Sequence, residues 1–83
     1  MMAQASPDVI QAKKFEVVND DGKVVAAIGA NNKGGGALSI WNDDGKLAAR
    51  LLAIENGGAL SICNKDGEPV ARIDAFENGG ALT

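Results

Sequence analysis

The chain has 83 residues, of which 46% are apolar but only 4% aromatic, and it carries a net charge of −3. This length predicts one small domain, and a single cysteine without any histidine excludes an intrachain disulfide and a zinc site built from Cys and His. No basic patch is interleaved with aromatic residues, which argues against nucleic-acid binding, and no apolar run approaches the ~20 residues of a membrane-spanning helix.

Residues 1–13 are expected to form a separate N-terminal segment. Ser6 as an N-cap before Pro7 favours a short helix over 7–14, while an extended strand from Val9 to Val17 is an equal alternative. The segment lacks a basic region followed by an apolar stretch, so no secretory signal peptide is predicted. Together with the single thiol of Cys63, which fits a reducing compartment, this predicts a cytoplasmic location.

From residue 14 onward the sequence repeats itself about every 22 residues. An Asn-x-Asp-Gly turn sequence begins at Asn19, Asn42 and Asn64. A Gly-Gly-Ala-Leu sequence begins at Gly35, Gly57 and Gly79. The first copy carries one extra residue, within 31–34. This self-similarity predicts one all-β repeat domain over 14–83, with copies at about 15–36, 37–58 and 59–80 and a partial copy at 81–83.

Each copy is expected to be a strand, a turn and a second strand. Asn-Gly at 56–57 and 78–79 signals a two-residue hairpin turn, and Asn-Asp-Asp-Gly at 42–45 suits a longer one. A four-residue loop at 42–45 pairs Leu38 with Ala49 and keeps the apolar residues of all strands on one side. A three-residue loop would pair Leu38 with Arg50 and break this pattern.

We call the side predicted in this way the first face, and the opposite side the second face. The expected members of the first face are Phe15, Val17, Val24, Ala26, Ile28, Leu38, Ile40, Leu47, Ala49, Leu51, Ala53, Leu60, Ile62, Ala71, Ile73, Ala75 and Leu82. The second face mixes polar and apolar residues, and its apolar part is too large for isolated surface positions. The self-association interface is therefore expected there, at Trp41, Leu52, Ile54, Val70, Phe76, Arg50 and Arg72.

The expected pairings also leave the strands staggered. The strand 46–55 would meet its predecessor mainly through 46–50 and its successor mainly through 49–55, so about half of each edge would be unpaired. A homotrimer built as a β-prism or intertwined β-shaft satisfies both the stagger and the two apolar sides. A small closed barrel or β-roll made by one chain is the alternative.

The run from Lys14 to Ala26, followed by Gly-Gly-Ala-Leu-Ser-Ile and a second Asn-Asp-Asp-Gly-Lys, resembles a group of short bacterial proteins. These have uncharacterised function and are built from tandem β-hairpin repeats. More loosely, the chain is similar to the trimeric β-rich shafts of phage tail fibres and spikes. The resemblance covers 14–83 and rests on turn and core signals, so it implies a fold and self-assembly and carries over no active-site residues.

The acidic turns are the candidate metal ligands, because calcium prefers six to eight oxygen atoms. The aspartates concerned are Asp20, Asp21, Asp43, Asp44 and Asp66. Lys65 replaces the first aspartate in the third copy, and no loop alternates its ligands as calcium loops do. The favoured interpretation is that these residues form turns, with no metal and no cofactor.

Other candidate sites are better explained by architecture than by binding. Trp41 is expected to pack between chains or against a neighbouring strand rather than to stack on a sugar. Arg72 is expected to pair with Asp74 or with glutamates of another chain. Gly34-Gly35-Gly36 opens no helix and is interpreted as a loosened hairpin turn, not a phosphate loop. Without a catalytic constellation the chain is predicted to be no enzyme but a structural module that associates with itself as a stalk, spacer or scaffold. The alternative is a module that binds carbohydrate, protein or calcium.

Overall fold

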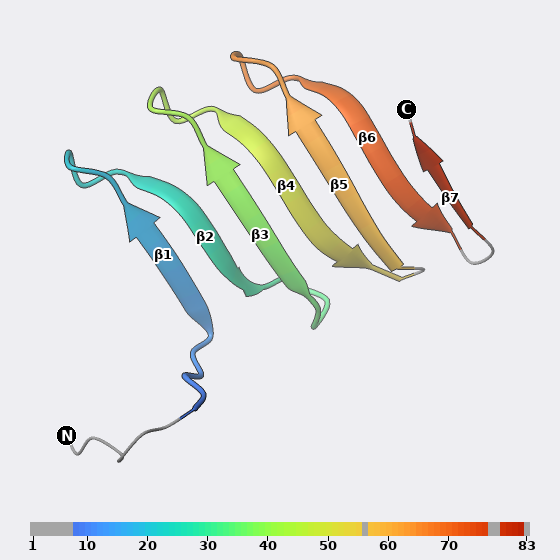
Figure 1. The fold of residues 1–83 in the computed structure, drawn as a ribbon, viewed down its shortest axis with the longest axis horizontal. Helices are drawn as coiled ribbons and strands as arrows, with labels where there is room; N and C mark the ends of the chain where they lie inside the picture. The colour runs from blue at the N-terminus through green and yellow to red at the C-terminus, as the bar shows by residue number, and fades with distance from the viewer. Residues whose placement is uncertain (1–7, 56, 77–78, 83) are drawn as a thin grey trace.

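The computed structural model describes residues 8–55, 57–76 and 79–82. These residues form seven antiparallel strands in one sheet, and the order of the strands in the sheet follows the chain (Figure 1). The strands are β1 (Lys14–Val18), β2 (Val24–Ala30), β3 (Gly36–Trp41), β4 (Leu47–Ile54), β5 (Gly57–Cys63), β6 (Pro69–Phe76) and β7 (Gly79–Leu82). The all-β fold of consecutive strand–turn–strand units predicted from the sequence is confirmed, and the units form a meander.

The described part of the N-terminal segment, residues 8–13, forms neither helix nor strand. Figure 1 shows it leading away from the start of β1. The helix expected over 7–14 is not found in this part, and the strand expected from Val9 begins only at Lys14. Ser6 and Pro7 lie outside the described residues. A helix of about two turns has little intrinsic stability in water, and Val9 and Ile10 are too exposed to hold one by packing.

The turn at 42–45 is shorter than predicted. The Asn42 N–H donates to the Lys46 carbonyl at 2.9 Å, and the Gly45 N–H donates to the Asn42 carbonyl at 3.0 Å. Gly45 has φ +82°, so three residues form a type I turn closed by a left-handed glycine. The four-residue loop predicted from the sequence is wrong.

A β-bulge beside this turn keeps the apolar residues in phase. Trp41 pairs with Leu47 but Ile40 pairs with Ala49, which leaves Ala48 without a partner. Leu38 therefore faces Leu51, neither Arg50 nor the predicted Ala49. The first and third copies shift register at the same place, between Val17 and Val18 and between Ile62 and Cys63.

The bulges also correct the membership of the two faces. Leu47 pairs with Trp41 and Val24 pairs with Val18, and both of these partners belong to the second face. Directly opposite residues in a sheet lie on the same side, so Leu47 and Val24 belong to the second face as well. The other residues predicted for the first face share one side of the sheet.

The connection from β4 to β5 is two residues long, as predicted, but begins one residue earlier. Ile54 pairs with Gly57, so Gly57 belongs to the strand, and Leu51 pairs with Leu60. The predicted pairing of Ala53 with Leu60 is wrong by two residues. Gly57 has φ +146°, and a Cβ atom there would lie 2.8 Å from the Ala75 Cβ. The prediction of a turn at 78–79 rests partly on residues outside the described ones.

With the observed register, the stagger predicted from the sequence disappears. β4 pairs with β3 between Leu47 and Leu52, and with β5 between Ala49 and Ile54. Nearly the whole strand therefore has neighbours on both sides. Unpaired strand edges inside the meander are no longer an argument for association with other chains.

The extra residue of the first copy creates another turn of the Asn-x-x-Gly kind. The Asn31 N–H donates to the Gly35 carbonyl at 2.7 Å and the Gly34 N–H to the Asn31 carbonyl at 3.3 Å, with Gly34 at φ +91°. This pattern is the one seen at 42–46. The stretch predicted to be a loosened turn is a well-formed three-residue loop.

One asparagine organises each of these four turns. The side-chain Oδ1 atoms of Asn19, Asn31, Asn42 and Asn64 each accept the backbone N–H groups two and four residues ahead, at 2.9 to 3.1 Å. The Asn42 amide also donates to the Lys65 carbonyl of the next turn at 3.2 Å. Asn42 thus closes its own turn and links it to a neighbouring turn.

Replacing Asn42 by alanine is expected to lower the free energy of unfolding by about 2 kcal/mol, because two accepted bonds and one donated bond are lost. Asn42→Asp keeps the acceptor oxygens and loses only the donor to Lys65, so about 1 kcal/mol is expected. Urea titrations at one fixed protein concentration measure both values. Equal losses for the two variants would show that the Oδ1 bonds do not stabilise the turn.

The described residues contain almost no core. Ala59, at 1% exposure, is their one buried apolar residue. The accessible surface is 6436 Å², whereas a compact protein of this mass exposes about 4,700 Å². The radius of gyration is 15.6 Å, against about 12 Å for a compact domain of this length.

The sheet is open. β1 and β7 are its two outer strands, and their described residues do not pair with one another. The closed single-chain barrel, the alternative left by the sequence, is therefore not formed. The described residues also include no helix of the length and apolar character needed to cross a membrane.

Candidate self-association surface

One large apolar residue from every strand lies in a single row across the first face. Each member is paired directly with the next, from the first strand to the last. We call this row the apolar ridge, and it consists of Phe15, Ile28, Leu38, Leu51, Leu60, Ile73 and Leu82.

The apolar ridge is largely uncovered. Leu51, in the central strand, is 48% exposed and Ile73 is 49% exposed, while only Leu38 and Leu60 are half-buried. Single exposed leucines are normal on protein surfaces, but a continuous row across seven strands marks a surface that other groups cover.

The rows on either side of the ridge are also apolar. Toward the turns that connect β2 to β3 and β4 to β5, the next row holds only alanine and glycine. We call it the small-residue strip, and it consists of Ala30, Gly36, Ala53, Gly58, Ala75 and Gly80. On the other side lie Val17, Ala26, Ile40, Ala49, Ile62 and Ala71. None of these three rows contains a charged or polar side chain.

The second face has a polar row at its centre. This row runs through Glu16, Ala27, Ser39, Arg50, Ser61 and Arg72. The Arg50 Nε donates to the Ser39 Oγ at 3.1 Å. The Arg72 Nε lies 2.7 Å from the Asp74 Oδ1, which confirms the predicted ion pair.

The apolar residues that were expected to form the interface are mostly covered within the chain. Trp41, Leu52 and Ile54 are half-buried, and Val70, the unpaired residue of the third bulge, is 63% exposed. Phe76 ends β6, and its side chain lies outside the described part. An interface on the second face stays a prediction, but the larger uncovered apolar surface is the first face.

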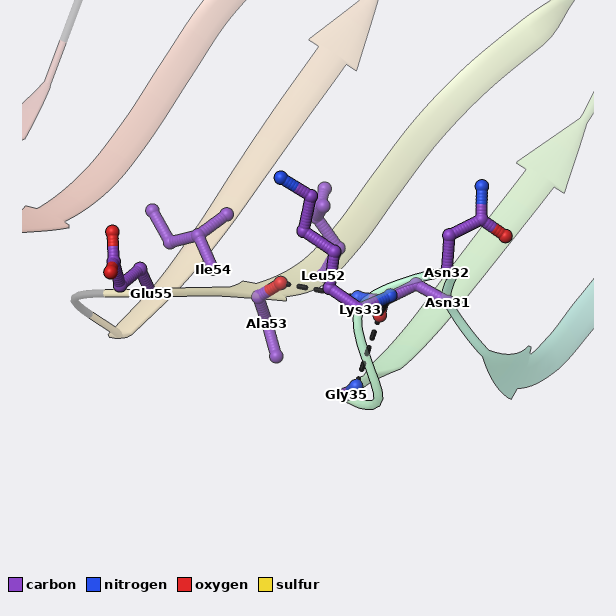
Figure 2. A pocket seen from close by; sticks show the side chains of 8 residues that line it. All are labelled: Asn31, Asn32, Lys33, Gly35, Leu52, Ala53, Ile54 and Glu55. Atoms are coloured by element: carbon purple, nitrogen blue, oxygen red, sulfur yellow. Dashed lines mark hydrogen bonds between the residues drawn. The ribbon is translucent and has the colours of Figure 1, made fainter.

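A hollow of about 740 Å³ lies where the turn after β2 meets the end of β4. Figure 2 shows Leu52 and Ile54 pointing to one side of β4 and Ala53 to the other. The Asn31 amide donates to the Ala53 carbonyl at 3.3 Å and holds the turn against β4. The hollow is open, and its two charged lining residues are Lys33 and Glu55.

The acidic turns do not converge. Asp20, Asp21, Asp43, Asp44 and Asp66 lie in three separate turns at one end of the sheet (Figure 1). In the described ranges no three His, Cys, Asp or Glu side chains come close enough together to hold a metal ion. The aspartate before each glycine donates its backbone N–H to the turn asparagine, which is the role of a turn former.

The sequence pattern identified the ridge residues as members of one face but did not reveal the small-residue strip. The available signal was the Gly-Gly-Ala that precedes each leucine, which places a glycine two residues from a ridge position in each copy. Only the register shows that alanines of the even-numbered strands complete this strip. Comparison of the chain with protein-family models, with curated proteins and with solved structures gave no match.

Proposed function

We propose that this chain is a non-catalytic β-repeat module that associates with itself and serves as a stalk, spacer or scaffold. The observation that carries the proposal is the uncovered first face, with three adjacent apolar rows and a continuous ridge. A folded chain that exposes such a surface gains stability when a partner removes it from water.

The exposed surface area and the free energy gained by covering it both favour self-association. The chain exposes roughly 1,800 Å² more surface than a compact protein of its mass, and a stable interface needs about 800 Å² from each partner. Covering one half-exposed ridge residue contributes about 1 kcal/mol. The five exposed ridge residues together supply several kcal/mol, which the nearly coreless single chain lacks.

The repeat suits a structural role. Each hairpin contacts only its neighbours in the sheet, so a longer array extends the sheet without changing its units. The three-walled prism or shaft expected from the sequence is one arrangement that covers the first face. A sandwich of two sheets is another.

Static light scattering at micromolar concentration tests the proposal, and a mass of two or more chains is expected. The melting temperature is expected to rise with protein concentration, because dissociation and unfolding are coupled in an assembly of this kind. A single-chain mass of 8.5 kDa together with a melting temperature independent of concentration would contradict self-association.

A further inference from the structure

Building on the proposed self-association, we infer that two copies pack their first faces together so that the apolar ridge of each lies in the small-residue strip of the other. The ridge and the strip run parallel across the sheet, one pleat repeat apart. Leu51 and Ala53 mark them on β4, as Leu60 and Gly58 do on β5.

The spacing makes the first face complementary to itself. Ridge and strip are two residues apart along each strand from β2 to β7, which is about 7 Å. A two-fold axis parallel to the ridge and midway between the two rows exchanges them. Leu51 then lies over the partner's Ala53, and the partner's Leu51 lies over Ala53. Large side chains meet small ones from β2 to β7, as close packing requires, whereas Phe15 on β1 would lie over the partner's Lys13.

The size of the face limits the area that two copies can bury. Seven strands about 4.8 Å apart give a width of roughly 34 Å, and strands of this length extend about 20 Å. The footprint of the whole face is therefore on the order of 700 Å². Because the axis lies between ridge and strip, about two thirds of it faces the partner, which is less than the ~800 Å² that each partner contributes to a stable complex of standard size. The polar turn residues Lys33 and Glu55 lie at the rim, where polar groups are normal.

Three such walls enclose too much space when their strands run along the prism axis. In a triangular prism with walls roughly 34 Å wide, the middle of each wall lies about 10 Å from the axis. Side chains in a packed two-sheet core reach only about 5 Å from their own sheet. The central ridge residue Leu51 and the neighbouring Ala49 and Ala53 would then face a void, whereas the two-sheet arrangement fills it.

Three variants of β4 test this register: Leu51→Ala, Ala53→Leu, and the double variant in which the large and the small residue change places. Sedimentation equilibrium of the full chain gives the dissociation constant of each. Leu51→Ala leaves a void and Ala53→Leu creates overlap, so each is expected to raise Kd by about tenfold or more. The double variant again places leucine over alanine, and its Kd is expected to return to within about threefold of the original.

The possible outcomes distinguish a failure of the inferred ridge-in-strip packing from a failure of the proposed self-association. If the double variant is as weak as the two single effects combined, ridge and strip do not face each other and the inference is wrong. A mass of three chains would overturn the two-sheet arrangement but support self-association. A mass of one chain would overturn both. In each experiment the circular dichroism of the variant confirms that the sheet is intact.

Discussion

Leu51→Lys is expected to convert the proposed assembly to single chains over the micromolar range. Leu51 lies at the centre of the apolar ridge on the middle strand, so self-association through the first face would bury the new charge without a partner. Such burial costs several kcal/mol, which corresponds to an increase in Kd of about 100-fold or more. Light scattering across a dilution series measures the change.

The matched control is Leu52→Lys, the same substitution at the next residue of the same strand. Leu52 points to the second face and lies between Ala37 and Ala59 in the sheet. We expect some loss of stability because Leu52 is half-buried, but no change in mass. The opposite pattern, dissociation by Leu52→Lys and not by Leu51→Lys, would move the interface to the second face, where the sequence first placed it.

Insertion of one alanine between Leu51 and Leu52 is expected to abolish the fold. The insertion reverses the facing of every residue that follows it in β4, because side chains alternate with a period of two. The three natural bulges lie beside turns. In the middle of β4, however, β3 and β5 would both have to accommodate the extra residue. The expected result is loss of the β-sheet circular dichroism signal and of a cooperative unfolding transition.

Deletion of Lys33 is the control for this insertion. It also changes the chain by one residue, but it falls in a turn and gives the first copy the 22-residue spacing of the others. The sheet is expected to form with a small change in stability. If the insertion in β4 is tolerated as well as this deletion, the register of the central strands does not control folding.

The sequence by itself determined the local structure of this protein. The repeated Asn-x-x-Gly turns, the number and order of the strands and the sharing of sides by most apolar residues all follow from turn chemistry and from alternation. These features depend on neighbours along the chain. The Arg72–Asp74 pair was predictable for the same reason, since the two residues are adjacent on one side of β6.

Only the tertiary structure decided the register and the exposure of the two faces. A four-residue loop and a three-residue loop followed by a bulge both place Leu38 and Leu51 on one side, so a pairing error of two residues leaves the alternation unchanged. The same error produced the false stagger. The alternation of side chains along a strand also shows which residues share a side of the sheet. It does not show what covers that side. The ridge from Phe15 to Leu82 became recognisable as an uncovered surface once the sheet was seen to be open.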